Sequence, residues 1–249
     1  MFTLKLKSAS DNLPLRLIWL HGWGHSHKAL LPLAEYFQDS AENYLIDLPG
    51  FGESPEPDKP LDTEDYADLL QDFISSLPPK DTVLITHSFG GRVAIEAAAK
   101  YPHSIKAMVL IASPGLKVKR SLGFKIKAFF MKRLSRLIRR FPQIKSLPVI
   151  RNLKLGSADY RNASPIMRQI LVKSVNKDLS LKAMQVSCPV LLLYGAEDTA
   201  TPSYLGKRFQ ELMPDAKYSE LPMHDHYTVL ASGAPLVENQ IENFLAEIK

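Results

Sequence analysis

A chain of 249 residues is long enough for one α/β domain and a small inserted element. Hydrophobic residues make up 45% and charged residues 23% of it, as is typical of globular proteins, and its apolar run at residues 13–20 is far shorter than a membrane-spanning helix. Its amino-terminal segment lacks the apolar stretch of a secretory signal, and its single cysteine, Cys188, excludes an internal disulfide, so we expect a cytoplasmic protein.

The formal net charge is only +5, but the basic residues are concentrated in one segment. Residues 117–154 contain 13 of the 31 Lys and Arg residues and no Asp or Glu, which leaves 18 basic and 26 acidic residues in the rest of the chain. A segment of this kind is either an inserted element with a partner of its own or a well-solvated surface.

Short aliphatic and β-branched runs recur along the chain and alternate with helical stretches. Several of these runs are continuously apolar, as expected for strands buried on both faces of a parallel sheet. Helices are expected at about 62–77, which begins with acidic residues and ends before two prolines, and also at 89–100 and 235–248. The alternation predicts an α/β fold with a mostly parallel central sheet flanked by helices. The expected strands are 2–7, 15–20, 43–47, 81–86, 107–112, 189–194 and 217–221.

The alternation is interrupted between residues 115 and 186, where no convincing strand appears. In the stretch LGFKIKAFFMKRLSRLIRRF, apolar residues recur at helical spacing and basic residues occupy the other positions. We therefore expect a core formed by residues 1–114 and 187–249, with a helical lid inserted at 115–186. Phe129 and Phe130 belong to the apolar stripe and are expected to line a substrate pocket.

The stretch THSFGG, residues 86–91, lies between an expected strand and an expected helix. It fits the small-x-Ser-x-Gly pattern of a nucleophile elbow, in which a strained reversal of the chain lifts the serine oxygen clear of the sheet. The first small residue is normally glycine, so Thr86 is a departure. The order of strand, motif and helix favours Ser88 as a nucleophile over a plain turn serine.

The stretch LHGWGHS, residues 20–26, follows another expected strand. Acyl transfer develops negative charge on the substrate oxygen, which two preorganised backbone amides can hold. We expect the amides of Trp23 and Phe89 to be these donors, and the Trp23 ring to form a wall of the pocket. The tight turn IDLPGFGES, residues 46–54, is expected to be structural.

Two late motifs supply an acid and a base. YGAEDTATP, residues 194–202, presents Asp198, and LPMHDHYTVL, residues 221–230, offers His224 and His226. A serine hydroxyl is a poor nucleophile until a base takes its proton, and the base needs a carboxylate to fix its tautomer. Asp198 could instead cap the following helix, and either histidine could be the base.

Together, HGWG, DLPGFGES, THSFGG, GAEDTATP and DHYTVL resemble the α/β-hydrolase superfamily over residues 15–248. The resemblance implies a serine hydrolase that cleaves carboxylic esters or thioesters through an acyl-enzyme, with Ser88, Asp198 and His226 as its triad and no cofactor or metal. The family usually has Gly-His where this chain has Asp225-His226, which favours His226 over His224. HGWG and DLPGFG are also similar to the carboxylesterases that cleave pimeloyl-[acyl-carrier protein] methyl ester in biotin synthesis.

Alternatives remain for the partner and for the activity. The basic segment is a solvated face over the pocket, a docking surface for an acidic acyl carrier protein, or a membrane-surface contact. Nucleic acid is disfavoured because the aromatic residues of this segment belong to its apolar stripe and none is placed among the charges to stack on bases. The alternative from another class is a non-catalytic protein that binds a small molecule on the same fold.

Overall fold

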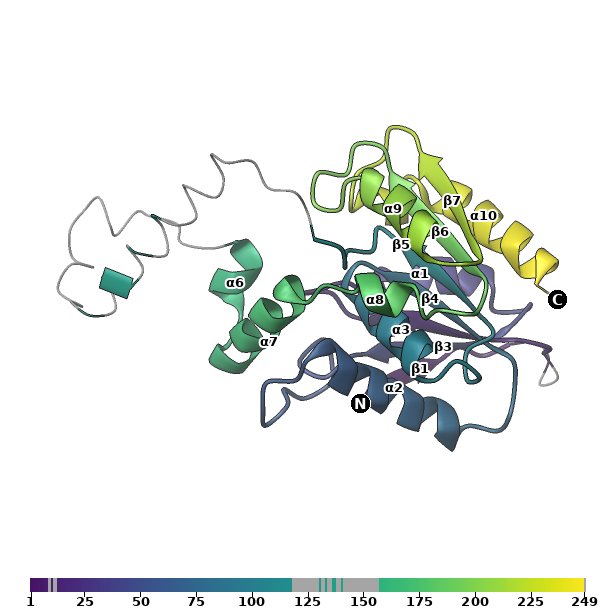
Figure 1. Ribbon diagram of the computed structural model, residues 1–249. Helices are drawn as coiled ribbons and strands as arrows, with labels where there is room; N and C mark the ends of the chain where they lie inside the picture. The colour runs from purple at the N-terminus through teal and green to yellow at the C-terminus, as the bar shows by residue number, and fades with distance from the viewer. Residues whose placement is uncertain are drawn as a thin grey trace.

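The sheet is the centre of the computed structural model, which describes residues 1–8, 10, 13–117, 130, 133, 136, 137, 140 and 157–248. Within these residues, seven strands form one sheet in the order β1-β3-β2-β4-β5-β6-β7 (Figure 1). β1 pairs with β3 in antiparallel orientation, and the other neighbouring strands are parallel. The strands are β1 (Phe2–Lys5), β2 (Arg16–Leu20), β3 (Glu42–Asp47), β4 (Thr82–His87), β5 (Ala107–Ile111), β6 (Val190–Gly195) and β7 (Ala216–Leu221).

The apolar runs of the sequence became the strands of this sheet. Each expected strand is present, with its ends within two residues of the expected ones, and the predicted mostly parallel sheet is confirmed. Every residue of β2, β4, β5 and β6 is buried. Successive side chains point to opposite faces of a strand, so Ile18 and Leu20 enter one core cluster while Leu17 and Trp19 enter the other.

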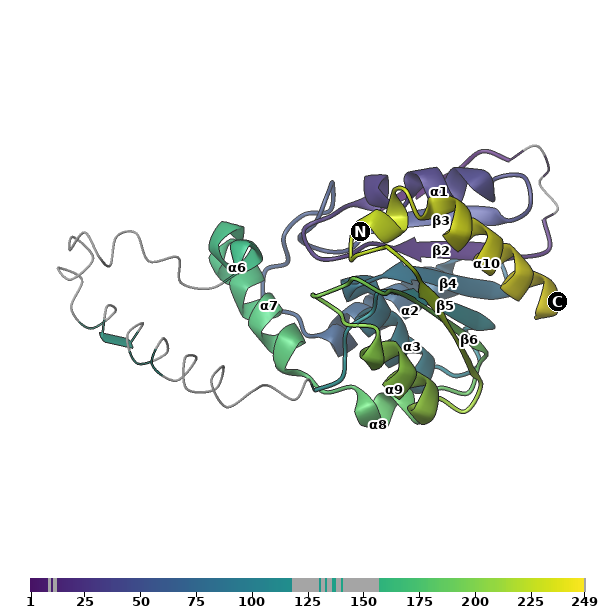
Figure 2. The same cartoon turned by 90° about the horizontal axis from the view of Figure 1, so that it is seen from above.

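Helices cover both faces of the sheet (Figure 2). α1 and α10 lie on one face, where Leu33 and Ile241 join the smaller core cluster. α2, α3, α8 and α9 lie on the other, where Leu70, Val93 and Phe209 join the larger cluster. The helices are α1 (Leu31–Tyr36), α2 (Thr63–Ser76), α3 (Phe89–Lys100), α6 (Ala158–Asn162), α7 (Pro165–Asn176), α8 (Ser180–Ala183), α9 (Tyr204–Leu212) and α10 (Ala234–Glu247), with 3-10 turns η1 (His27–Ala29) and η3 (Thr228–Leu230).

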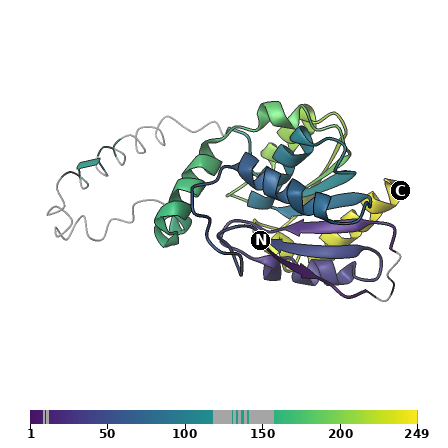
Figure 3. The same ribbon diagram turned by 90° about the horizontal axis from the view of Figure 1, so that it is seen from below.

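Among the described residues between β5 and β6 there is no strand, and this part of the chain includes the helices α6, α7 and α8. α6 and α7 lie beyond one end of the sheet rather than on either face, as Figures 1, 2 and 3 show. The amphipathic helix expected in residues 122–141 falls almost entirely outside the described residues. The division into a core and a lid therefore stays a prediction. Among the described helices, none is long and apolar enough to cross a membrane.

Candidate active site

The predicted site residues follow the carboxyl ends of four parallel strands, which meet at one edge of the sheet. Ser88 follows β4 directly, and Trp23 lies in the loop after β2. Asp198 lies in the loop after β6, and His226 lies in the loop after β7. Residues far apart in the sequence are therefore brought together by the parallel arrangement itself.

The serine lies at a sharp turn between β4 and α3. Ser88 has φ 48° and ψ −108°, a conformation that a residue with a side chain rarely adopts. Its amide donates a hydrogen bond of 2.9 Å to the carbonyl of Ile111, which ties the turn to β5. The helix then starts very close to β2, since a Cβ on Gly90 would lie 2.3 Å from the Leu20 carbonyl oxygen. Thr86 is accommodated because its hydroxyl is buried and donates to the Val109 carbonyl at 3.1 Å.

A hydrogen-bonded chain runs from this serine to a buried carboxylate. His226 Nε2 lies 3.1 Å from Ser88 Oγ, and His226 Nδ1 lies 2.8 Å from Asp198 Oδ2. With the carboxylate accepting from Nδ1–H, the lone pair of Nε2 faces the serine hydroxyl. His224 does not join this chain. Its carbonyl accepts the amide hydrogen of Glu197 at 3.0 Å instead.

The Asp198 carboxylate is held in its ionised form. Burial acts to raise its pKa, but hydrogen bonds from His226 and from the hydroxyl and amide of Thr201 outweigh burial and lower the pKa below its ordinary value. Oδ1 accepts from the amides of Ala200 and Thr201, both at 2.7 Å, and Oδ2 accepts from the Thr201 hydroxyl at 2.5 Å. Asp198 therefore closes a turn of its own loop and also orients His226.

Two contacts of this site did not emerge from the sequence. Thr201 Oγ1 lies 3.1 Å from His226 Nδ1, so this hydroxyl adjoins both the acid and the imidazole. His87 Nε2–H donates to the His226 carbonyl at 3.0 Å. Burial lowers the pKa of His87 to about 3, so its ring is neutral. The spacing of Thr201 three residues after Asp198 was a signal for the first contact, whereas the second joins loops that are distant in sequence.

The loop after β2 approaches the serine closely. A Cβ on Gly22 would lie 2.7 Å from His87 Nδ1 and 3.3 Å from Ser88 Cβ, so glycine is needed there. His21 holds this loop, because its Nδ1–H donates to the Gly22 carbonyl at 2.7 Å and its Nε2 accepts from the Leu48 amide at 3.1 Å. Burial lowers the pKa of His21 to about 4, which keeps the ring neutral for both bonds.

Trp23 and Phe89, the two residues whose amides are the expected donors, contact each other through their side chains. The Trp23 ring packs edge-on against Phe89, with ring centroids 5.4 Å apart, and against Phe51 at 4.9 Å. Among the described residues, no protein acceptor takes a hydrogen bond from the amide of Trp23 or of Phe89. Both amides are therefore available to an oxygen atom of a bound molecule.

The DLPGFGES turn supports the loop structurally. The buried carboxylate of Asp47 accepts from the amide and the Nδ1–H of His27, at 2.5 and 2.9 Å, and from the Glu53 amide at 2.9 Å. Gly52 has φ +55°, and a Cβ there would lie 2.1 Å from Asp47 Oδ2. Asp47 is therefore fully engaged in joining the loops after β2 and β3.

A cavity of about 470 Å³ opens beside Ser88 and His226. Trp23 and Phe89 belong to its wall, and residues of α7 line the opposite part. The expected pocket residue Phe130 is not among the described residues that line this cavity, and it is 64% exposed. Phe129 lies outside the described residues.

The sequence was compared with models of known protein families. The model of the alpha/beta hydrolase family matches residues 17–239, which is most of the chain. The chain belongs to the alpha/beta hydrolase family. The resemblance indicated by the five sequence motifs is thereby confirmed.

Relatives within this family share about a quarter of their residues with the chain. A pimeloyl-[acyl-carrier protein] methyl ester esterase of Chromobacterium violaceum is 28% identical over 231 residues, covering 86% of this chain and 88% of that protein. A protein of the same name from Shewanella woodyi is 29% identical over 255 residues, covering 91% and 90%. A solved esterase structure from Thermogutta terrifontis has a TM-score of 0.73 at 19% identity, covering 99% and 93%, which shows likeness of fold alone.

Proposed function

We propose that this alpha/beta hydrolase is a serine esterase that cleaves a carboxylic ester or thioester through an acyl-enzyme. The observation that carries the proposal is the chain from Ser88 Oγ through the His226 imidazole to the Asp198 carboxylate, with links of 3.1 and 2.8 Å. Such a chain, at a strained turn that opens into a cavity, is what activation of a hydroxyl for acyl transfer requires. The esterase names of two relatives support it.

In the first half of the reaction, Ser88 Oγ attacks the ester carbonyl carbon while its proton passes to His226 Nε2. The carbonyl oxygen becomes negatively charged and accepts hydrogen bonds from the amides of Trp23 and Phe89. The bond from carbon to the leaving oxygen then breaks, and the proton on Nε2 moves to that oxygen. An alcohol leaves, or a thiol from a thioester, and the acyl group stays on Ser88.

In the second half, a water molecule takes the place of the leaving group. His226 Nε2 accepts a proton from the water as its oxygen attacks the acyl carbon, and then returns the proton to Ser88 Oγ as the acid departs. Asp198 keeps Nδ1–H in place and stabilises the imidazolium in both halves, since its lowered pKa keeps it ionised. We propose that the lid predicted at residues 115–186 limits access of bulk water, a role supported by the α7 residues that line the cavity.

Replacement of the nucleophile tests this proposal. Turnover of p-nitrophenyl acetate is expected to fall by about 10⁴-fold or more in Ser88→Ala, because the acyl-enzyme cannot form. Ser76→Ala, at an exposed serine of α2, is the matched control and is expected to keep wild-type turnover. Unchanged turnover in a correctly folded Ser88→Ala protein would rule out the serine mechanism.

A second candidate substrate is an ester carried on an acidic acyl carrier protein. It is favoured by the names of the two relatives and by the basic segment 117–154, whose charge complements an acidic carrier. These names favour a carrier over a membrane surface as partner. Charge reversal at Arg136, Arg139 and Arg140 is expected to slow hydrolysis of a carrier-bound ester more than that of its free counterpart, and equal slowing would remove the candidate.

A further inference from the structure

An arginine lies in the cavity one helical turn after the serine. Arg92 lies in the first turn of α3, four positions after the N-cap Ser88, so the two share one side of the helix with a rise of about 6 Å between them. Both line the same cavity. Arg92 is only 7% exposed, and its helix neighbours Val93, Ala94 and Ile95 are fully buried. A cation in such surroundings needs a compensating interaction.

The described residues provide acceptors for only part of the hydrogen-bonding capacity of the Arg92 guanidinium. A guanidinium has five N–H donors, and the described residues offer Arg92 one acceptor, the Lys177 carbonyl at 3.2 Å. None of its nitrogen atoms is both fully buried and without a partner. The N–H groups that have no acceptor among the described residues are therefore accessible, and Arg92 lines the cavity.

A carboxylate partner is also missing. Among the described residues, none forms an ion pair with Arg92, and the segment 118–156 contains no Asp or Glu that could supply one. Asp178 exerts an electrostatic influence on Arg92 but accepts a hydrogen bond from Ser180. Burial lowers the pKa of Arg92 to about 10, which still leaves it charged at neutral pH.

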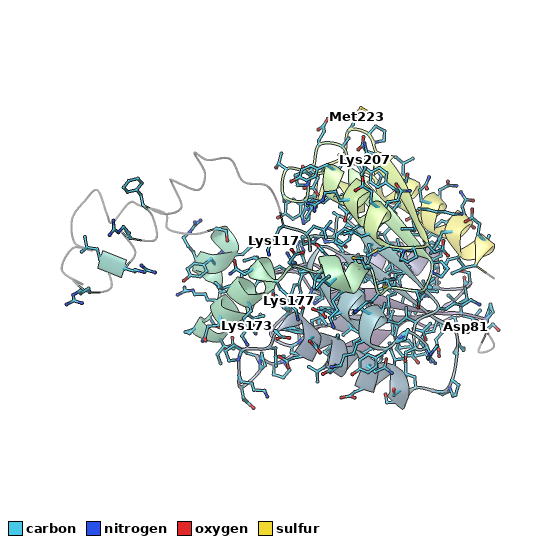
Figure 4. The ribbon with its side chains drawn as sticks, in the orientation of Figure 1. Asp81, Lys117, Lys173, Lys177, Lys207 and Met223 are labelled. Atoms are coloured by element: carbon cyan, nitrogen blue, oxygen red, sulfur yellow. The ribbon has the colours of Figure 1, made fainter. Side chains whose placement is uncertain are left out.

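The other cations of the cavity differ from Arg92 in this respect. Lys177 pairs with the buried Glu96 at 2.7 Å, and Lys117 pairs with Asp178 at 3.5 Å. Figure 4 shows both lysines on the side of the molecule that faces α7. Asp159 is the single carboxylate among the described lining residues, and it is exposed. Among the described lining residues, cations therefore outnumber carboxylates, and Arg92 is the cation that has no ion-pair partner there.

We propose that Arg92 binds a carboxylate on the acyl chain of the substrate, so that the preferred substrates are half-esters of dicarboxylic acids. The proposal rests on the esterase function given above. The ester carbonyl lies at Ser88, the methylene groups pack against the apolar lining residues Leu171 and Val175, and the free carboxylate accepts the N–H groups of Arg92. A planar guanidinium suits this role because it can donate two parallel hydrogen bonds to one carboxylate.

A comparison of matched esters tests the assignment. The kcat/KM values are measured for monomethyl esters of dicarboxylic acids with four to seven carbons, and for methyl esters of the monocarboxylic acids of the same lengths. The wild type is expected to prefer the charged ester of at least one length. In Arg92→Leu the ratio of kcat/KM for the charged ester to kcat/KM for the uncharged ester is expected to fall by about 10- to 100-fold, as for loss of a charged hydrogen bond. Arg92→Lys is expected to keep part of the preference for the charged ester.

Lys207→Leu is the matched control, because it removes the same charge from an exposed position on α9, away from the cavity (Figure 4). Its ratio is expected to equal that of the wild type. If Ser88-dependent turnover persists while neither Arg92 variant changes the ratio, the carboxylate assignment is wrong and the esterase function stands.

A binding measurement separates the two proposals if no ester is turned over. Ser88→Ala protein is titrated with glutarate, adipate and pimelate by calorimetry, and the same titration is made with Arg92→Leu added. Binding that depends on Arg92 supports the anion site even where the esterase function has failed. Absence of binding, or binding that Arg92→Leu leaves unchanged, overturns the assignment.

Discussion

His87 and Thr201 act on the imidazole of His226 from two sides. Thr201 Oγ1 lies beside Nδ1, and His87 Nε2–H donates to the backbone carbonyl of the same residue. The His87 ring also packs against the His226 ring, with centroids 4.9 Å apart. We propose that His87 positions His226, the base of the proposed mechanism, and does not carry a proton itself, because its lowered pKa keeps it neutral.

Loss of this contact is expected to slow turnover without weakening substrate binding. His87→Phe removes the donor to the His226 carbonyl while keeping an aromatic ring, and kcat for p-nitrophenyl acetate should fall roughly 10-fold with little change in KM. His87→Gln, which can still donate, should recover part of the loss. A kcat within twofold of wild type in His87→Phe would show that the contact does not position the base.

The sequence identifies residues whose role depends on local pattern better than those whose role depends on long-range contact. Ser88 follows from the small-x-Ser-x-Gly spacing, and Asp198 from its place after a strand. Arg92 and His87 have no such signature, since their partners Lys177 and His226 are distant in sequence. The expectation for Phe130 used helical periodicity, which places residues on one face but does not say what that face meets.

At the scale of elements, α3 sets the position of the serine by its close packing on the sheet. A Cβ on Gly90 would meet the Leu20 carbonyl carbon at 2.8 Å and its oxygen at 2.3 Å, and both atoms are backbone atoms of β2. Such a contact cannot be relieved by turning a side chain, so the helix or the strand would have to move. The conformation of the turn at Ser88 therefore depends on the close packing of α3 against β2.

Gly90→Ala is expected to lower the free energy of unfolding by at least about 3 kcal/mol, measured by urea denaturation. Gly24→Ala is the comparison: its φ is +72° but a Cβ there meets nothing within 4 Å, so the cost should be only the backbone strain of about 1–2 kcal/mol. Equal destabilisation by the two variants would contradict the close approach of α3 to β2.

The order of strands and helices along the chain was predictable because strands buried on both faces of a parallel sheet have continuous apolar sequences. The runs at β5 and β6 are apolar at nearly every position, and the acidic start of α2 forms a capping box between Asp62 and Asp65. The order of the strands across the sheet required the structure, since a run of apolar residues does not specify its neighbour.

At the scale of the whole molecule, two buried neutral histidines link stability to pH. Folding lowers the pKa of His21 to about 4 and that of His87 to about 3, whereas an unfolded histidine titrates near 6.5. Between about pH 6.5 and 4 the unfolded chain binds more protons than the folded one, so the free energy of unfolding falls as pH falls. The lowered pKa of Asp198 also stabilises the folded state, and this contribution to the free energy of unfolding is lost only below about pH 4.

The free energy of unfolding is therefore expected to decrease by a few kcal/mol between pH 7 and pH 4.5, as measured by urea denaturation across this range. His87→Phe should have a shallower slope, because one of the two groups no longer titrates. The same slope in His87→Phe and wild type would mean that His87 takes up its proton without unfolding.

Covalent labelling of the serine is the most direct test of the central claim, that Ser88 is an activated nucleophile. The protein is treated with a fluorophosphonate, digested with trypsin and analysed by mass spectrometry. The tryptic peptide 81–92 contains Ser88 as its single serine. A stoichiometric adduct on Ser88, lost in His226→Ala, is the predicted result. A folded wild-type protein that forms no adduct, or an adduct on another serine alone, would contradict the account.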